Sequence, residues 1–570
     1  MPRAAVLVAA GVAAAALAGG GVALVAGSEE DERRAAPRTT SPTAVPTSPS
    51  PSPTPSPTPT TAPGPRAGDT PTVRRVRAGD RFALSATAAR TAVPRQGTAT
   101  VVYLVADDEL ALGWAAVPGA AARGGAVLLT PGDRLPSGTA KELARLGPDE
   151  VVVVGDEDAV SSRVEDAARR VAPVTRVDED DPVVAARAVT RAAFTTSAAA
   201  WVVSAERTTD LAAAAATAAA RRAPLVVVGE GARSLPAADA DLLRALGVAQ
   251  ATVVGGTGTV AEGVATGLTA ALGAGGVRRV EGADRFVLAA RVHERAWDGA
   301  TAAAAVVVNP ARSTDAFTGS VLAGHAAAPL YWSFPHCLPG ASRDGVLAPT
   351  VADVTVVGGE RSVRSLVDGL VPCRSTEDPT SAWVLVNKRN GLSPKGFVPD
   401  DLEVVPMDHN GGHRLAEDAA EALAAMAAGS RVAGAGTLGI DTAFRSRETQ
   451  DALYDKYLAR RGRTWTDRWY LRPGYSEHQT GLAVDLLPIG RSNCTINDCI
   501  DETPQGVWLA RNSWRYGFIL RYERGYTGTT GVGFEPWHFR YVGKELARAY
   551  HDGGWHTLED FLGRPAAPTY

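Results

Sequence analysis

The sequence has no large excess of charge of either sign. Its 62 acidic and 58 basic side chains leave a formal net charge of -4 on 570 residues. A chain with so balanced a charge lacks the long-range field that draws proteins to nucleic acid or to anionic membranes. We therefore predict no nucleic-acid partner, and any bound polyanion would need a local basic patch.

Cysteine is also scarce. The four cysteines form two separated couples, Cys337 with Cys373 and Cys494 with Cys499. Neither couple has the two-residue gap of a zinc knuckle, whereas an oxidising compartment would join the members of each couple. We predict two disulfides, with zinc ligation and unpaired thiols as the alternatives.

Charged residues are missing from an early segment that runs from Ala4 to Gly27 and follows the basic Arg3. Its length approaches the ~20 apolar residues of a spanning helix, but its small residues also resemble a signal-peptidase site. Residues 1–28 are predicted to be a cleaved signal peptide or an uncleaved membrane anchor, with a buried core helix as the third interpretation. The first two place the rest of the chain outside the cytoplasm, because Arg3 would stay inside.

Residues 29–71 have little to bury, because proline, threonine and serine dominate their composition. Such a segment predicts a disordered, extended linker. Beyond it, apolar segments ending in glycine recur with a period of about a hundred residues, which predicts three copies of one domain. The copies are placed at residues 72–173, 174–275 and 276–373.

Within each copy, short valine and leucine runs alternate with alanine-rich stretches such as residues 210–221. This alternation is typical of buried parallel strands joined by crossover helices, so each copy is predicted to be an α/β domain. The glycines after the strands form no G-x-G-x-x-G motif, and no Walker lysine is present. We interpret them as tight turns rather than as a nucleotide site.

Short motifs recur, each in two of the three copies: an Asp-Arg opening, a Thr-Asp pair (Thr209-Asp210 and Thr314-Asp315) and a closing V-V-G-G. With these motifs, residues 72–373 resemble the cell-wall-binding repeat 2 family. The resemblance implies a pseudo-threefold unit that attaches to an anionic cell-wall polymer. The first copy has Asp108-Glu109-Leu110 in place of the Thr-Asp pair, and the second lacks the Asp-Arg opening. A scaffold without ligand is the alternative for those copies.

After a linker at residues 374–382, histidine and carboxylate residues gather in two pieces of residues 383–570, at 476–485 and 535–538. Catalytic zinc takes three protein ligands and leaves a fourth position open, so we predict one Zn²⁺ ion on His478, Asp485 and His538. Glu535 is then free to act as general base toward the attacking water. Zinc acidifies water and polarises a carbonyl, so such a site needs no serine or cysteine nucleophile.

The spacing S-x-H-x-x-G-x-x-x-D, followed by E-x-W-H, resembles the zinc D-alanyl-D-alanine carboxypeptidases of the VanY type, in the hedgehog/DD-peptidase fold group. The resemblance extends over residues 383–563 and implies an α+β domain. It also implies that Arg445 binds the substrate carboxylate or the developing oxyanion, although Phe444 replaces the tyrosine frequent before this arginine. Three further substrate-contacting residues are implied, with structural support as their alternative role: Ser476, Gln450 and Trp537.

These features predict a multidomain chain in which three α/β repeats with parallel sheets precede an α+β peptidase domain. The leading hypothesis is a carboxypeptidase that removes terminal D-Ala from peptidoglycan stem peptides and is held at the wall by its repeats. An L,D-carboxypeptidase or a wall endopeptidase of the same fold is the first alternative. A non-catalytic wall-binding protein is the alternative from another class.

Overall fold

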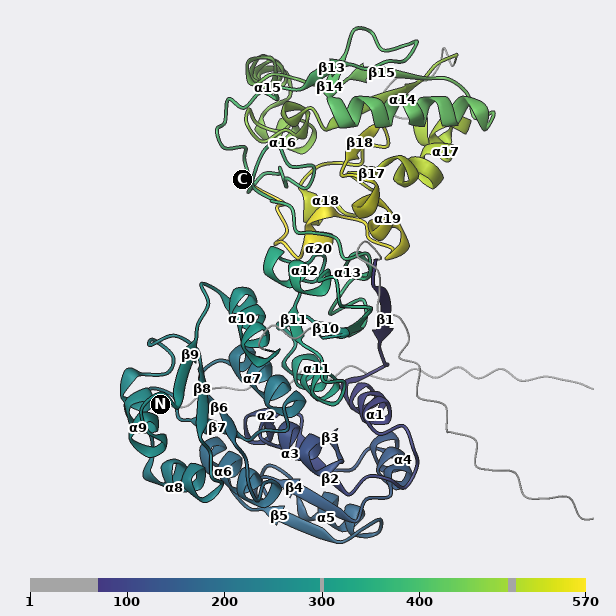
Figure 1. Cartoon of the computed structure of the whole chain (residues 1–570). Helices are drawn as coiled ribbons and strands as arrows, with labels where there is room; N and C mark the ends of the chain where they lie inside the picture. Colours follow the sequence, from purple (N-terminus) through teal and green to yellow (C-terminus); the bar gives the residue numbers. More distant parts are fainter. Residues whose placement is uncertain (1–69, 298–301, 491–498) are drawn as a thin grey trace, which may run out of the picture. The chain divides into compact units, whose positions relative to one another are not determined.

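A computed structural model describes residues 70–297, 302–490 and 499–570 (Figure 1). All of them belong to one compact unit, Pro63–Tyr570. The predicted signal peptide or anchor at residues 1–28, and the linker apart from its last two residues, lie outside the described residues. In the three described ranges, no helix is both long and apolar enough to cross a membrane.

Three four-stranded sheets, each parallel throughout, form the first part of the described chain (Figure 1). The first has the strand order β3 (Ala126–Thr130), β2 (Val101–Ala106), β4 (Glu150–Val154), β5 (Val174–Val177). The second has the order β7 (Leu225–Val228), β6 (Ala199–Ser204), β8 (Gln250–Val254), β9 (Val277–Val280). The third has the order β11 (Leu330–Trp332), β10 (Ala304–Val308), β12 (Asp353–Val357), β1 (Thr72–Val76). The predicted α/β class of the repeats is therefore confirmed.

Helices join the parallel strands, as crossover connections require. They are α1 (Arg81–Ala92), α2 (Leu110–Gly113), α3 (Ala116–Arg123), α4 (Ser137–Leu146), α5 (Ser162–Arg169), α6 (Pro182–Ala193), α7 (Thr208–Ala220), α8 (Ala237–Ala245), α9 (Glu262–Leu272), α10 (Arg285–Trp297), α11 (Ser313–His325), α12 (Gly340–Val346) and α13 (Ser365–Asp368).

Each sheet takes one edge strand from a different copy. The strand that opens the second copy, β5, pairs with β4 of the first, and β9 pairs with β8 in the same way. The opening strand of the whole repeat region, β1, pairs with β12 of the third copy. The sheets are thus offset by one strand from the sequence copies, and β1 closes the series on itself.

In each sheet, a glycine follows the strand that pairs with this edge strand, namely β4, β8 or β12. These glycines have a positive φ, at 114° for Gly155, 111° for Gly255 and 121° for Gly358. Glycine adopts this conformation without steric cost, so the backbone at these residues agrees with the predicted turns. An arginine on each edge strand donates to the glycine carbonyl: Arg176 to Gly155 at 2.7 Å, Arg279 to Gly255 at 2.9 Å and Arg75 to Gly358 at 2.9 Å.

Small residues bring the helices of different copies into close contact. Ser320 on α11 donates to the Ala212 carbonyl of α7 at 3.0 Å, and a Cβ added at Gly324 would lie 2.3 Å from the Ala219 Cβ. The alanine-rich helix predicted at residues 210–221 therefore lies against the next copy and is almost completely buried. One hydrophobic core that includes α3, α7 and α11 joins the copies.

A buried histidine links two copies, and we expect its protonation to destabilise the folded protein at acidic pH. The His293 ring on α10 contacts the Leu330 backbone and approaches the Thr217 hydroxyl at 3.3 Å. Burial lowers the pKa of His293 from 6.5 to about 4, against the opposing hydrogen bond to Leu330. The unfolded chain therefore binds more protons as the pH falls below 6.5, so this contribution to stability is complete above pH 6.5 and is lost toward pH 4. The loss amounts to about 3 kcal/mol.

Thermal unfolding between pH 7 and pH 4 measures this effect. We expect the melting temperature of the unmodified protein to fall with pH more steeply than that of a His293→Gln variant. A His551→Gln variant is the matched control, because His551 is exposed and paired with Asp552. Equal slopes for all three proteins would contradict the role of His293.

The disulfide predicted between Cys337 and Cys373 is present, so that prediction is confirmed. Cys499 is also disulfide-bonded, while Cys494 lies outside the described residues.

The second part of the described chain is an α+β domain, as predicted. Its antiparallel sheet has the order β15 (Leu438–Thr442), β16 (Ala483–Pro488), β18 (His538–Tyr541), β17 (Phe518–Leu520), and a short pair is formed by β13 (Leu402–Val404) and β14 (Arg414–Ala416). Its helices are α14 (Glu417–Val432), α15 (Arg447–Arg461), α16 (Arg463–Trp469), α17 (Pro504–Asn512), α18 (Thr527–Thr530), α19 (Lys544–Asp552) and α20 (Leu558–Leu562). The 3-10 turns are η1 (Glu477–Thr480), η2 (Ile500–Glu502) and η3 (Ser513–Tyr516).

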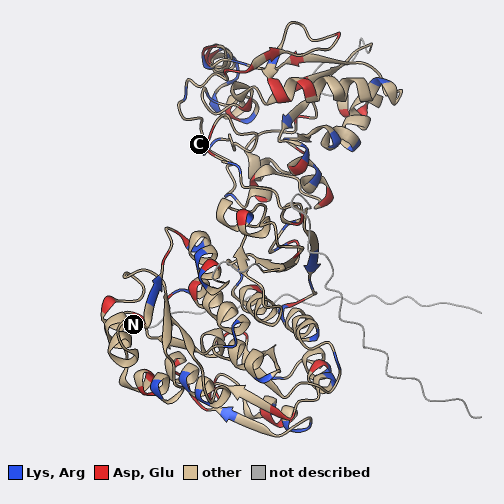
Figure 2. Cartoon of the chain, in the orientation of Figure 1, with Lys and Arg blue, Asp and Glu red and all other residues tan. Residues whose placement is uncertain are grey.

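Leu423 and Met426 of α14 share one core with Val484 and Phe539 of the sheet, so the sheet has a buried support behind its strands. Figure 2 shows acidic and basic residues interspersed over the described helices and strands, in keeping with the small net charge.

Candidate metal and peptidase site

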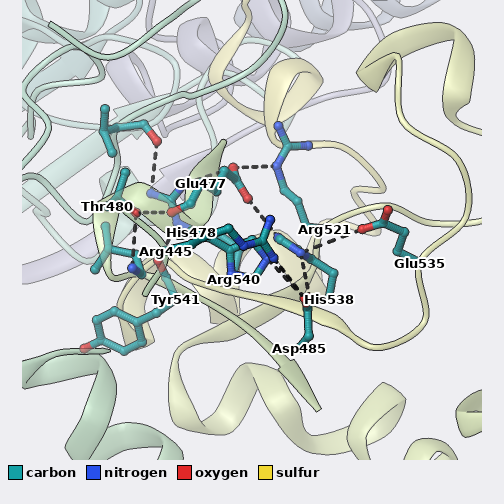
Figure 3. Close-up of polar contacts among 12 residues, drawn as sticks. Arg445, Glu477, His478, Thr480, Asp485, Arg521, Glu535, His538, Arg540 and Tyr541 are labelled. Atoms are coloured by element: carbon teal, nitrogen blue, oxygen red, sulfur yellow. Dashed lines mark hydrogen bonds and ion pairs between the residues drawn. The ribbon is translucent and has the colours of Figure 1, made fainter. Parts of the chain in front are cut away.

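The three predicted metal ligands meet at the centre of the antiparallel sheet (Figure 3). Asp485 on β16 and His538 on β18 are directly paired in the register of the two strands. Side chains paired in this way project from the same face of a sheet. His478 comes from η1, just before β16, so the chain returns to the same point within a few residues.

The geometry of this group fits a metal ion. One ligand atom from each residue lies within 4.8 Å of the others, and among the described residues this is the group of histidine and carboxylate side chains that meets this spacing. His478 Nε2 lies 3.2 Å from Asp485 Oδ2, and His538 Nδ1 lies 3.1 Å from Asp485 Oδ1. All three are buried. Two imidazoles and one carboxylate are a donor set for zinc with a fourth position open.

Hydrogen bonds on the far side of each imidazole orient the ring. His478 Nδ1 lies 2.8 Å from the Ala443 carbonyl oxygen, which leaves Nε2 free to face Asp485. His538 Nε2 lies 3.3 Å from Glu477 Oε2, which leaves Nδ1 toward Asp485. Such partners on the second ring nitrogen are typical of metal-ligating histidines. These contacts hold each ring with its other nitrogen turned toward Asp485.

Glu477 belongs to a buried network that sequence reasoning did not identify. Its Oε1 accepts from Arg521 Nε and from Arg540 Nη1, each at 2.9 Å. Arg521 also pairs with Glu559, at 2.7 Å and 3.0 Å. All four side chains are buried. The network fixes Glu477 and, through it, the ring of His538.

Electrostatics keep the predicted ligand carboxylate ionised. Burial opposes ionisation of Asp485, but the charges and hydrogen bonds of His478 and His538 outweigh it and hold its pKa well below the usual range. Burial likewise lowers the pKa of His478, which favours the neutral ring that a metal binds.

Glu535 lies beside the candidate metal site, with its Oε2 3.8 Å from His538 Nδ1 (Figure 3). The side chain is buried and lines the same cavity as the three ligands. Burial raises the pKa of Glu535 to about 8, while the His538 charge opposes this rise and the Asp485 charge adds to it. A carboxyl group whose pKa lies near neutrality can both accept and release a proton.

The cavity has a volume of about 660 Å³ and is lined by every residue predicted for the site. Arg445 reaches it with Nη2 3.9 Å from Asp485 Oδ2. Arg445 Nη1 donates to Gln450 Oε1 at 2.7 Å, and Gln450 Nε2 donates to the Leu471 carbonyl at 2.6 Å. Gln450 is thus engaged in holding Arg445, and its predicted contact with substrate stays a prediction. Ser476 and Trp537 are buried in the cavity wall.

The fold and the site together define an α+β domain with a buried cluster of histidine and carboxylate side chains, which follows three parallel-sheet repeats in the sequence. Comparison with known families agrees with this class. The family described as D-alanyl-D-alanine carboxypeptidase (VanY) matches residues 412–544, and the family described as cell wall binding domain 2 (CWB2) matches residues 279–368.

Individual relatives each cover a part of this chain. YodJ, a candidate carboxypeptidase of Bacillus subtilis (strain 168), is 33% identical over 202 residues, which are 34% of this chain and 71% of that protein. A D-alanyl-D-alanine carboxypeptidase of Enterococcus faecalis (strain ATCC 700802 / V583) is 38% identical over 135 residues, which are 22% of this chain and 46% of that protein. Among solved structures, Cwp8 from Clostridium difficile is 24% identical, with a TM-score of 0.48. The match covers 53% of this chain and 52% of Cwp8.

The chain belongs to the VanY D-alanyl-D-alanine carboxypeptidase family and carries a cell wall binding domain before its peptidase domain. It spans about half the length of the Enterococcus faecalis protein and of Cwp8.

Proposed function

We propose that the protein is a zinc-dependent D-Ala-D-Ala carboxypeptidase that acts on peptidoglycan stem peptides. The observation that supports this proposal is the convergence of His478, Asp485 and His538 around one point, with Glu535 in the same cavity. A zinc ion held by these three residues would lower the pKa of a water molecule and polarise the scissile carbonyl.

The chain's own residues would carry the proton transfers. Glu535 takes a proton from the attacking water as its oxygen bonds to the carbonyl carbon, and returns it to the amide nitrogen as the C–N bond breaks. The products are the shortened peptide and free D-Ala. The Arg445 guanidinium in the cavity wall would bind the terminal carboxylate of the substrate or the developing oxyanion. Ser476 and Trp537 would contact the peptide from the same wall.

Mass spectrometry of muropeptides incubated with the protein tests the proposed reaction. We expect pentapeptides to lose one terminal alanine. Conversion of tetrapeptides to tripeptides would indicate the L,D-carboxypeptidase alternative, and cleaved cross-links would indicate an endopeptidase. Either result without pentapeptide shortening would contradict the proposal.

Removal of the metal gives a second test. Treatment with a chelator is expected to abolish the loss of D-Ala, and stoichiometric Zn²⁺ is expected to restore it, because the proposed reaction depends on a metal ion to acidify the attacking water and polarise the carbonyl. Metal analysis of the untreated protein should give one zinc per chain. Full activity in a sample shown to be free of metal would contradict the assigned ligands.

We also propose that the repeats attach the enzyme to an anionic cell-wall polymer, outside the cytoplasm, after export directed by residues 1–28. The cell wall binding domain match in the third copy supports this role. Deletion of residues 72–373 is expected to reduce sedimentation with purified walls. The control is the full chain with walls stripped of their anionic polymer. Equal sedimentation of both proteins with intact walls would contradict attachment through the repeats.

A non-catalytic wall-binding protein is the second candidate. The presence of Glu535 in the cavity argues against it, because a protein that only binds the peptide has no use for a buried carboxylate beside the metal ligands.

A further inference from the structure

Four of the side chains that line the cavity are aromatic and come from the segment that contains α15 and α16. They are Tyr457, Trp465, Trp469 and Tyr470, and we call them the aromatic platform. The rings of Tyr457 and Tyr470 stack with centroids 4.1 Å apart, and Trp465 lies 5.8 Å and 6.1 Å from these two rings. Trp469 lies 6.5 Å from Trp465. The four rings therefore form one cluster.

The platform is held in place from behind. A Cβ added at Gly533 would lie 2.3 Å from the Trp469 ring, so the indole packs directly on the backbone at this glycine. Tyr454 of α15 donates to Asp467 of α16 at 2.7 Å, and Arg472 pairs with the same carboxylate at 2.9 Å. The rings are thus in position before a ligand arrives, which lowers the entropic cost of binding.

The outer part of the platform faces solvent. Trp465 has 36% of its surface exposed and is the one tryptophan among the large exposed hydrophobic residues of the described chain. Exposed aromatic surface that continues a ligand cavity indicates a binding site. Arg461 and Arg468 lie over the rings of Trp465 and Trp469, at 5.3 Å and 5.5 Å, and both are exposed.

This combination fits a sugar ring better than a peptide. The C–H face of a pyranose packs on aromatic rings, and guanidinium groups at the rim can donate to its hydroxyl, acetamido and carboxylate oxygens. The polar groups suited to the peptide terminus, Arg445 and Ser476, lie among the other lining residues. We propose that the aromatic platform is a second subsite, which binds a sugar of the glycan strand that carries the stem peptide. This inference rests on the proposed function.

Kinetics with two substrates test the subsite. One is a free pentapeptide ending in D-Ala-D-Ala, and the other is the same peptide attached to the N-acetylglucosamine–N-acetylmuramic acid disaccharide. For Trp465→Ala we expect KM for the glycan-linked peptide to rise about 3- to 10-fold, the value of one aromatic contact, with kcat unchanged. KM for the free peptide should not change. Trp465→Phe should recover most of the affinity, because it restores a ring.

Trp514→Ala is the matched control, because Trp514 stacks on His551 with centroids 4.3 Å apart and does not line the cavity. It should leave both KM values unchanged. An equal rise for both substrates in Trp465→Ala would show that the platform binds the peptide and would overturn the inference, as would no change for either.

Binding separates this inference from the proposed function. Titration calorimetry with the Glu535→Gln protein gives the Kd of each substrate without turnover. If the unmodified enzyme cleaves neither substrate, the proposed function fails. The effect of adding Trp465→Ala to the Glu535→Gln protein on the two Kd values still shows whether the platform binds the sugar. A selective loss for the disaccharide-linked peptide supports it, and equal Kd values with and without the substitution refute it.

Discussion

Replacing Glu535 by glutamine is expected to lower kcat for release of D-Ala by roughly 10²- to 10⁴-fold, the usual contribution of a general acid–base group. Glutamine keeps the size of the side chain but cannot accept the proton of the attacking water. KM and zinc content should change little, because Glu535 is not one of the three residues that converge on the candidate metal site. Steady-state kinetics with a D-Ala-D-Ala peptide and metal analysis of the same samples measure both quantities.

Glu545→Gln is the control for this substitution, since Glu545 is exposed on α19 and does not line the cavity. Its kinetics should match those of the unmodified enzyme. If a zinc-loaded Glu535→Gln protein turned over at the normal rate, Glu535 would not be the proton acceptor, and the proposed mechanism would be wrong.

The predicted metal ligands could be found from the sequence because they lie in two short pieces with a recognisable spacing. Their geometry follows from the register of β16 and β18, which pairs Asp485 with His538. The residues that orient His538 have no such signal. Arg521 is 44 positions from Glu477 and 38 from Glu559, so only the folded chain shows that these charges meet.

The repeat architecture shows a related limit of sequence periodicity. A period of about a hundred residues predicts three equal units. The period gives the length of a unit but not the position of the boundary between one unit and the next. The pairing of β1 with β12, and of β5 and β9 with the preceding copies, therefore had to come from the strand registers. The aromatic platform was also missed, because its four residues follow no motif and meet only through α15, α16 and the segment after them.

Loss of Glu477 is expected to affect both the stability of the peptidase domain and its affinity for zinc. A Glu477→Ala variant leaves the buried guanidinium groups of Arg521 and Arg540 without this carboxylate, which should cost about 3–5 kcal/mol. It also removes the acceptor opposite His538 Nε2, so zinc affinity should fall by about 10- to 100-fold. Urea unfolding of the metal-free protein and competition with a zinc chelator measure the two effects.

Glu559→Ala separates the two effects, because Glu559 pairs with the same Arg521 but makes no contact with His538. Both variants should lower the urea midpoint, since each leaves a buried guanidinium short of a partner. The chelator competition is run without urea, where both variants are folded. Under these conditions only Glu477→Ala should weaken zinc binding. Equal zinc affinities for the two variants would mean that Glu477 stabilises the domain without orienting the His538 ring.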